Sequence, residues 1–281
     1  MPTELSFELN GHHFAAQAWG NPKSSPILML HGWLDNSASF APLAEYIEDF
    51  YLVALDLAGH GYSDYRGGNG PYNIWEDVTD IFALADALNW QKFALLGHSR
   101  GAMIGLLAAG TFPDRITHLG LIEGLWPEPV DVSQAPQQLA KSIRQVRQQQ
   151  LKNTSCYASI EQAVEAREGG RFPLSRDAAQ LIVERGLKKQ GAGFTWSSDP
   201  KLFAASAFKL TEAHLQAFVK RIQAPVQVVL ANAGLLDMSE RFQQGLEHFA
   251  DIHVTCLDGG HHLHMESEAP QVAAVFQDFF Q

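Results

Sequence analysis

The stretch GHSRG at residues 97–101 decides how the rest of this 281-residue chain is interpreted. It matches the pattern Gly-x-Ser-x-Gly, which recurs by chance and is weak on its own. Here it follows a continuous apolar run at 93–96, typical of a buried strand, and opens a helix rich in small residues at 102–112. A serine on a strand-to-helix turn of this kind is lifted out of the sheet, and the flanking glycines allow close packing. The context therefore predicts that Ser99 is a nucleophile.

Two backbone N–H groups are expected to stabilise negative charge beside Ser99. The N-terminus of the following helix presents free N–H groups and a partial positive charge, so the N–H of Arg100 is the first donor. The second is expected at Trp33, because the His-Gly pair before it follows the buried strand 26–30 and lets the backbone fold back toward the same sheet edge. His31 is expected to order this loop by hydrogen bonding.

The loop DGGHHLHME at residues 258–266 is the expected source of the general base. It follows a strand and precedes the last helix, so a histidine in it can reach Ser99 across the sheet edge. His261 is the candidate, because a neutral imidazole suits proton transfer near pH 7. The histidines also raise a metal site as an alternative, but the loop has neither a helical His-x-x-x-His pair nor a cysteine pair. We therefore expect no metal, and packing roles for His262 and His264.

Two acids are candidates for the carboxylate that orients His261. Asp237 comes after the apolar strand 226–230, and Glu123 comes directly after the strand 119–122. Both lie at carboxyl ends of strands, where an open sheet of this type builds its site. Asp237 is the first choice. Glu123 stays open as the alternative, because the loop before Asp237 is longer than expected.

Strands and helices alternate along the first part of the chain, which predicts an α/β fold with a mostly parallel, doubly wound sheet. An Asn-Gly turn at 10–11 between two extended runs predicts an antiparallel hairpin at the N-terminus. The alternation stops near residue 124 and resumes near 222. We expect a core formed by residues 1–124 and 222–281, with a helical cap inserted at 125–221.

Composition narrows the classes of function. The formal net charge of −11 argues against nucleic acid as a partner, since a phosphate backbone requires clustered Lys and Arg. No stretch is apolar enough to span a membrane, and the first ten residues lack the pattern of a secretory signal, so a cytoplasmic protein is expected. The two cysteines, Cys156 and Cys256, are too few for a disulfide scaffold.

Taken together, these segments resemble the α/β-hydrolase superfamily, and most narrowly the serine hydrolase-like proteins. The chain order serine, acid, histidine agrees with that superfamily. The resemblance covers the core, about two-thirds of the chain. The segments that carry it are HGWLDN at 31–36, DLAGHGYS at 56–63, GHSRG at 97–101, GFTWSSDP at 193–200 and GGHHLH at 259–264.

The chain departs from the superfamily at two places. Ala102 stands where a second glycine is common, and the loop 232–237 holds its aspartate further from the strand than usual. The second departure leaves the choice of acid open. The superfamily also includes haloalkane dehalogenases and epoxide hydrolases, which use an aspartate nucleophile and are disfavoured by the serine at position 99.

The resemblance implies two-step acyl transfer without a cofactor or metal, with Ser99 as nucleophile, His261 as base, and Trp33 and Arg100 as oxyanion donors. We expect a small-molecule substrate, an apolar acyl or aromatic ester, because aromatic residues are frequent in the segment 125–221. Two alternatives stay open. The same residues could hydrolyse a thioester or a carbon–carbon bond or carry out perhydrolysis, or the fold could be a non-catalytic binding module.

Overall fold

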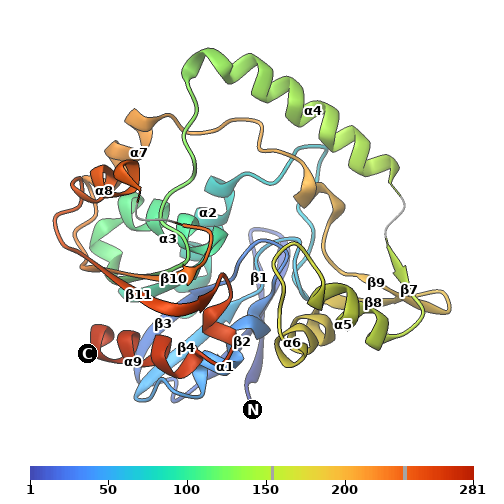
Figure 1. Cartoon of the computed structure of the whole chain (residues 1–281), viewed down its shortest axis with the longest axis horizontal. Coiled ribbons are helices and arrows are strands. Elements are labelled where there is room, and N and C mark those ends of the chain that lie inside the picture. The colour runs from blue at the N-terminus through green and yellow to red at the C-terminus, as the bar shows by residue number, and fades with distance from the viewer. Residues whose placement is uncertain (153–154, 237–238) are drawn as a thin grey trace.

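A central sheet of eight strands, in the order β1-β2-β4-β3-β5-β6-β10-β11, organises the molecule (Figure 1). The computed structural model describes residues 1–152, 155–236 and 239–281. The strands are β1 (Thr3–Leu9), β2 (His12–Trp19), β3 (Ser25–Leu30), β4 (Phe50–Leu55), β5 (Phe93–His98), β6 (Ile116–Ile122), β10 (Val226–Ala233) and β11 (Ile252–Gly260). From β4 to β11 neighbouring strands are parallel, whereas β1 pairs antiparallel with β2, and β2 antiparallel with β4. The predicted mostly parallel sheet and its N-terminal hairpin are confirmed.

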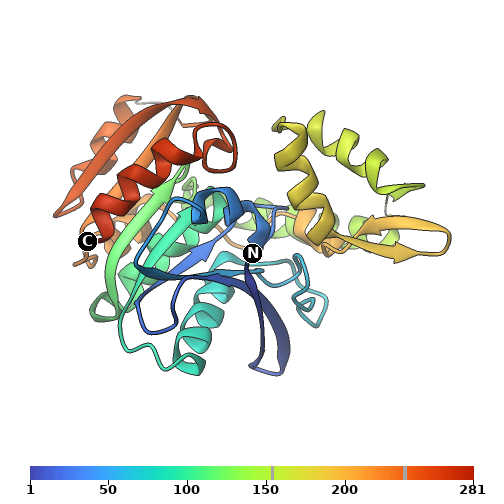
Figure 2. The same cartoon turned by 90° about the horizontal axis from the view of Figure 1, so that it is seen from below.

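Helices cover both faces of this sheet (Figure 2). On one face α2 (Ile74–Ala87) packs beside α3 (Arg100–Thr111), and on the other α1 (Ala41–Ala44) packs against α9 (Ala269–Phe280). Because side chains alternate along a strand, Leu95 belongs to the core under α3 and Leu96 to the core under α9. Both are fully buried, which explains why the sequence of a central strand such as β5 is continuously apolar.

The insertion, residues 125–221, leaves the sheet after β6 and returns before β10 (Figure 1). Its helices are α4 (Ala135–Leu151), α5 (Ile160–Glu168), α6 (Arg176–Gly186) and α7 (Glu212–Val219), and α8 (Glu240–Leu246) follows later in the core. The short 3₁₀ helices are η1 (Ser37–Phe40), η2 (Pro113–Arg115), η3 (Val132–Gln134), η4 (Pro200–Phe203) and η5 (Leu263–Met265). Among the described residues, no helix is both long and apolar enough to cross a bilayer.

The prediction that the insertion is purely helical is wrong. It also contains a three-stranded sheet of β7 (Cys156–Tyr157), β9 (Gly193–Trp196) and β8 (Leu187–Gln190). Strands β8 and β9 form a hairpin whose turn includes Gly191 at φ +59°. These strands have only two to four residues and two adjacent lysines, Lys188 and Lys189, so they show no apolar alternation that sequence inspection could detect.

A buried ion pair connects the insertion to the core. Arg185 of α6 donates through Nε to Asp56 at 2.9 Å, and Asp56 is fully buried at the end of β4. The backbone N–H groups of Ser37 and Tyr62 donate to the same carboxylate, at 2.7 and 2.9 Å. Because an unpaired buried charge is costly, these contacts hold α6 in one position on the core.

Candidate active site

Ser99 occupies the sharp turn between β5 and α3. Its backbone has φ 51° and ψ −111°, a conformation that a non-glycine residue adopts only under constraint. The Ser99 N–H donates to the carbonyl of Ile122 on the neighbouring strand at 2.8 Å. This strained turn places the serine at the carboxyl end of the sheet, directly before the helix N-terminus.

Close backbone packing explains the glycine that ends the GHSRG stretch. A side-chain carbon at Gly101 would lie 1.9 Å from the Leu30 carbonyl oxygen, which no side chain tolerates. The helix α3 can therefore approach the end of β3 only with glycine at this position. The same approach brings the end of β3 and His31 beside the start of α3.

His261 reaches Ser99 from the loop after β11, as the sequence predicted. Its Nε2 lies 3.1 Å from Ser99 Oγ, and its Nδ1 lies 3.1 Å from Glu123 Oε2. A carboxylate only accepts hydrogen bonds, so Nδ1 carries the proton and Nε2 is left to accept from the serine hydroxyl. His98 supports the loop from below, since its Nε2 donates to the His261 carbonyl at 2.8 Å.

Glu123 is the acid that contacts His261. It directly follows β6 with φ 49°, and the β5–β6 register, which pairs His98 with Ile122, sets it beside Ser99. Its side chain is buried, and its two oxygens accept from the N–H groups of Ala231 and Leu235, each at 2.8 Å. Three donors thus hold one carboxylate in place.

The other candidate acid, Asp237, lies outside the described residues. The preceding loop is informative, because β10 extends to Ala233 and the N–H of Leu235 points at Glu123. The chain after β10 therefore wraps around the Glu123 carboxylate. Sequence reasoning ranked Glu123 second. The signal that favours it is its position one residue after β6, the strand adjacent to β5, which ends directly before Ser99.

Of the two expected oxyanion donors, Arg100 follows Ser99 in the chain, and Trp33 lies in the loop after β3. Arg100 is the first residue of α3, where a backbone N–H has no partner within its helix. Its side chain is turned away, since Nη2 donates to Asp77 of α2 at 2.6 Å. Trp33 follows the ordered pair His31-Gly32: His31 Nδ1 donates to the Gly32 carbonyl at 2.8 Å, and its Nε2 accepts from Leu57 N–H at 3.0 Å.

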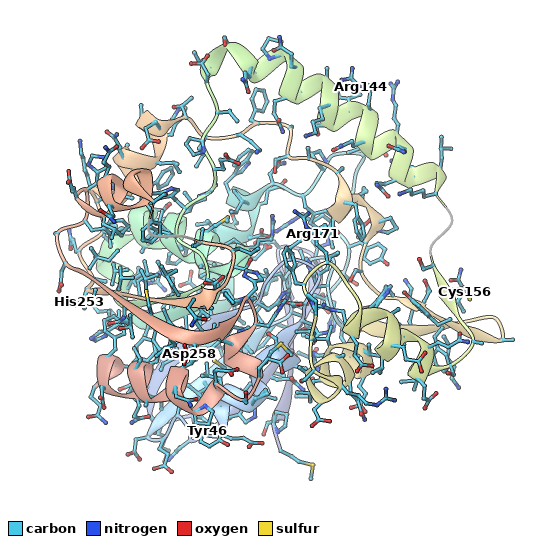
Figure 3. The ribbon with its side chains drawn as sticks, in the orientation of Figure 1. Tyr46, Arg144, Cys156, Arg171, His253 and Asp258 are labelled. Carbon is cyan, nitrogen blue, oxygen red and sulfur yellow. The ribbon has the colours of Figure 1, made fainter. Side chains whose placement is uncertain are left out.

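A cavity of about 620 Å³ lies between the insertion and the loop that carries Trp33. Its lining combines cationic side chains, Lys152 and Arg167, with a group of aromatic ones: Trp33, Tyr157, Phe172, Trp196 and Phe203. Ser99, His261 and Glu123 do not line this cavity, but one of its lining side chains, Phe172, has its ring 5.0 Å from the His261 ring, centroid to centroid. Arg171, on the connection between α5 and α6, also lines it (Figure 3). Trp126 packs instead against Phe242 and Phe249 in the core.

Comparison with known proteins decides the family. The model of the alpha/beta hydrolase fold matches residues 25–171, more than half of the chain. The chain belongs to the α/β-hydrolase family. This hydrolase is 29% identical over 296 residues to human serine hydrolase-like protein 2, a match that covers 99% of this chain and 94% of that protein.

Solved structures agree with this assignment. A hypothetical protein of Pseudomonas aeruginosa PAO1 superposes with a TM-score of 0.94 at 40% identity, over 99% of both chains. The thioesterase domain from the curacin biosynthetic pathway superposes with a TM-score of 0.86 at 24% identity, over 98% of this hydrolase and 99% of that domain. At 24% identity, the similarity to the thioesterase domain shows a shared fold alone. The predicted resemblance to the superfamily and to serine hydrolase-like proteins is confirmed.

A substitution at Gly234 tests whether activity of this hydrolase depends on the position of the Glu123 carboxylate. A side-chain carbon at position 234 would lie 2.3 Å from both oxygens of Glu123. We expect Gly234→Ala to displace that carboxylate and to lower kcat about 10²-fold, the typical cost of a misplacement near 1 Å. The matched control is Gly67→Ala, because nothing lies within 4 Å of that site. Equal kcat values for the two variants would show that the position of Glu123 is unimportant.

Because several histidines are buried, we expect the free energy of unfolding to fall as the pH is lowered. Burial lowers the pKa of His31, and it lowers the pKa of His60 well below its usual range. As pH falls below about 6.5, the unfolded chain binds protons that the folded chain refuses, so the free energy of unfolding falls. A histidine that stays neutral in the folded chain throughout this range costs about 1.4 kcal/mol per pH unit. Burial raises the pKa of Asp80 to about 6, and below that pH this group acts in the opposite direction.

The effect of the two histidines, His31 and His60, exceeds the opposite effect of Asp80. Together the three groups therefore lower the free energy of unfolding between pH 6.5 and 4.5. Urea unfolding at half-unit pH steps, in EDTA, measures the slope. His60→Gln should reduce the slope by about one proton, or ~1.4 kcal/mol per pH unit. An unchanged slope in that variant would contradict a neutral His60 in the folded state.

Proposed function

We propose that this protein is a serine hydrolase that cleaves a carboxylic ester through an acyl-enzyme, with Ser99 as nucleophile, His261 as base and Glu123 as the orienting acid. The observation that carries the proposal is the continuous line of contacts from Ser99 Oγ to His261 Nε2 and from His261 Nδ1 to Glu123, each 3.1 Å. A serine, an imidazole and a carboxylate linked in this order form the arrangement that activates a hydroxyl.

In the first step, His261 Nε2 takes the Ser99 proton as Oγ bonds to the substrate carbonyl carbon. The carbonyl oxygen becomes an oxyanion, and the N–H groups of Trp33 and Arg100 donate to it. His261 then gives its proton to the leaving oxygen, the ester bond breaks, and an acyl-Ser99 remains. In the second step, water loses a proton to His261 and attacks the acyl carbon, and that proton returns to Ser99 as the acid leaves.

The buried carboxylate keeps His261 in the reactive tautomer. The charge of Glu123 stabilises the imidazolium that forms in each step, and the hydrogen bond to Nδ1 prevents the ring from turning over. Two backbone N–H groups hold Glu123, so the acid is positioned before substrate binds. We therefore propose Glu123 as the acid in preference to Asp237.

The insertion acts as a cap in this proposal. It supplies most of the cavity wall and leaves an aromatic chamber next to His261. Trp33 and Phe203 meet edge to face with ring centroids 5.2 Å apart, which joins the core loop to the insertion at this chamber. An apolar acyl chain or an aromatic ester fits such a lining, because these groups gain most from burial against aromatic side chains.

Active-site labelling tests the proposal. A fluorophosphonate should label the wild-type protein at one serine, and Ser99→Ala should abolish the label. Equal labelling of the two proteins would refute Ser99 as nucleophile, and no labelling of either would favour a non-catalytic binding module. A panel of matched ester, thioester and diketone substrates then tests the ester assignment. Turnover of the thioester or diketone alone would replace it with the alternative chemistry at the same residues.

A further inference from the structure

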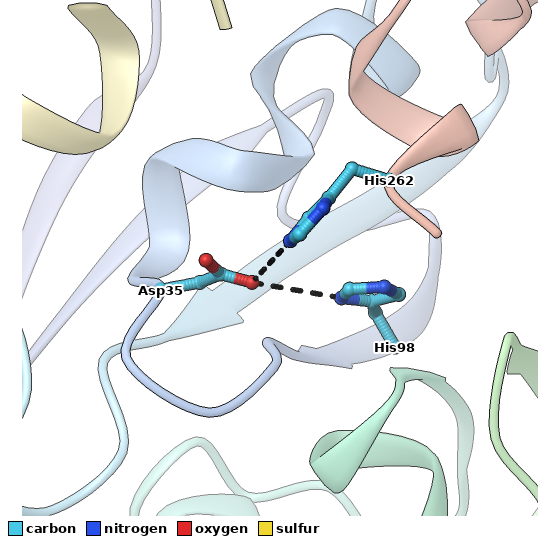
Figure 4. Close-up of side chains that lie close together, drawn as sticks. All are labelled: Asp35, His98 and His262. Carbon is cyan, nitrogen blue, oxygen red and sulfur yellow. Dashed lines mark ion pairs between the residues drawn. The ribbon is translucent and has the colours of Figure 1, made fainter. Parts of the chain in front are cut away.

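A second group of ligand-type side chains lies buried beside His261. Asp35 comes from the loop after β3, His98 from the end of β5 and His262 from the loop after β11 (Figure 4). Asp35 Oδ2 is 3.7 Å from His98 Nδ1 and 3.3 Å from His262 Nε2. One nitrogen or oxygen of each residue lies within 4.8 Å of the others. The three residues are between 0 and 5% exposed. Figure 4 shows both rings directing a nitrogen toward the same carboxylate oxygen.

The neutral His98 ring carries one proton, but both of its nitrogens face hydrogen-bond acceptors. Its Nε2 faces the His261 carbonyl at 2.8 Å, and a carbonyl only accepts, so Nε2 carries the ring proton. In the neutral ring Nδ1 then presents a lone pair, and that lone pair faces the Asp35 carboxylate, another acceptor. Within the described part of the chain, His98 Nδ1 has no hydrogen-bond partner.

A second proton on His98 would resolve the conflict, but the surroundings disfavour it. The His98 ring is completely buried, and the rings of His261, His262 and His264 lie 4.2–5.1 Å from it, centroid to centroid, so an added positive charge would be removed from water.

The other side chains around Asp35 leave its Oδ2 atom available to His98 and His262. Arg167 of α5 donates to the other oxygen, Oδ1, at 3.0 Å and so does not occupy the space between Oδ2 and the rings. The ring of His264 lies 4.2 Å from that of His98, centroid to centroid, and neither of its nitrogens has a partner among the described residues. Asp35 Oδ2 is therefore faced by His98 Nδ1, which has no partner among the described residues, and by His262 Nε2 at 3.3 Å, while Arg167 holds the other oxygen.

We propose that Asp35 Oδ2, His98 Nδ1 and His262 Nε2 bind a divalent transition-metal ion of the zinc type. Two imidazole nitrogens and a carboxylate oxygen are ligands that such ions prefer. Ligand atoms bound at about 2.0–2.1 Å around a tetrahedral zinc ion lie roughly 3.3 Å from one another. The separations of 3.3 and 3.7 Å from Asp35 Oδ2 come close to that value, and all three ligand atoms lie within 4.8 Å of one another, so a small adjustment of the side chains would bring them onto one ion.

The role assigned to this ion is to fix the loop that carries the base. His98 would bind the metal through Nδ1 while its Nε2 donates to the His261 carbonyl, and His262 is the next residue in the chain. An imidazole that binds a cation on one nitrogen is a stronger donor through the other. The metal would thus position His261 without contacting the substrate.

Metal binding to the full-length protein tests the proposal without reference to activity. Protein prepared without a histidine tag and treated with EDTA is titrated with ZnCl₂ by calorimetry, and separately with Co²⁺ while its visible d–d absorption is recorded. We expect one ion per chain, a rise in Tm on binding, and a Co²⁺ band typical of nitrogen and oxygen ligands. Absence of binding to the wild-type protein would overturn the proposal and leave water as the occupant.

Variants and diffraction locate the ion. His262→Gln should weaken Zn²⁺ binding at least tenfold. The control His253→Gln, on the edge strand β11 with a 73% exposed side chain, should leave it unchanged (Figure 3). If His262→Gln does not fold, anomalous diffraction from wild-type crystals grown with ZnCl₂ decides the question. Zinc between Asp35, His98 and His262 supports the site, and zinc bound only elsewhere, such as at the exposed thiols of Cys156 or Cys256, overturns it.

Discussion

Ser99→Ala is expected to lower kcat about 10⁶-fold on any ester that the wild-type protein turns over. The variant keeps the oxyanion donors and the cavity, so a small rate above that in water should remain, about 10³–10⁴-fold. The loss is this large because the serine and the histidine act as one unit, and His261 then has no hydroxyl to activate. Burst and steady-state kinetics with a chromogenic ester measure both the acyl-enzyme and its turnover.

Ser267→Ala is the matched control. Ser267 is exposed, and its hydroxyl bonds only to the neighbouring Glu268 in the hydrogen bonds found for it. We expect that variant to retain wild-type kcat. Turnover by Ser99→Ala within tenfold of wild type would end the proposal that Ser99 forms the acyl-enzyme. Circular dichroism and Tm of both variants separate lost chemistry from lost folding.

Glu123→Gln is expected to lower kcat about 10⁴-fold, the cost of removing the orienting charge from such a histidine. The glutamine has the size of the glutamate but carries two donors. If its nitrogen takes the place of Oε2, it meets the N–H of Leu235 and forces His261 Nδ1 to accept, which leaves Nε2 protonated and unable to take the serine proton. If its nitrogen takes the place of Oε1, it meets the N–H of Ala231, and the charge is still lost.

Asp237→Asn is the informative comparison, because Asp237 was the first choice from sequence. With Glu123 as the acid, we expect that variant to keep kcat within a few-fold of wild type. A loss near 10⁴-fold in Asp237→Asn together with a nearly silent Glu123→Gln would reverse the assignment. The readout is kcat under saturating ester, with Tm recorded to detect damage to the fold.

Part of the site could be predicted because its signals are local. The strand-turn-helix around Ser99 follows from an apolar run, two glycines and a run of small residues, and these occupy consecutive positions. The loops of Trp33 and His261 could be predicted for the same reason, since each follows a strand at the same edge of a parallel sheet. The structure brings His261 within 3.1 Å of Ser99 as expected.

The sequence alone could not decide between Glu123 and Asp237 as the acid, since both residues follow the carboxyl end of a predicted strand. What favours Glu123 is the register of β5 with β6 and the N–H groups of Ala231 and Leu235, which belong to β10 and the loop after it, more than a hundred residues later in the chain. The small sheet of the insertion was missed for another reason. Its strands are stabilised by pairing with one another and carry no apolar pattern of their own.

The sequence by itself determined the strand-turn-helix around Ser99, the histidine loop and the α/β architecture, because chain connectivity and apolar periodicity act over neighbouring residues. Only the tertiary structure decided which carboxylate meets His261 and which side chains meet Asp35. Those contacts join segments far apart in the chain, and their distances depend on strand register and on packing at the sheet edge. The loop with His261, His262 and His264 did not by itself indicate a metal site, whereas the fold brings His98, from the end of β5, and Asp35, from the loop after β3, next to His262.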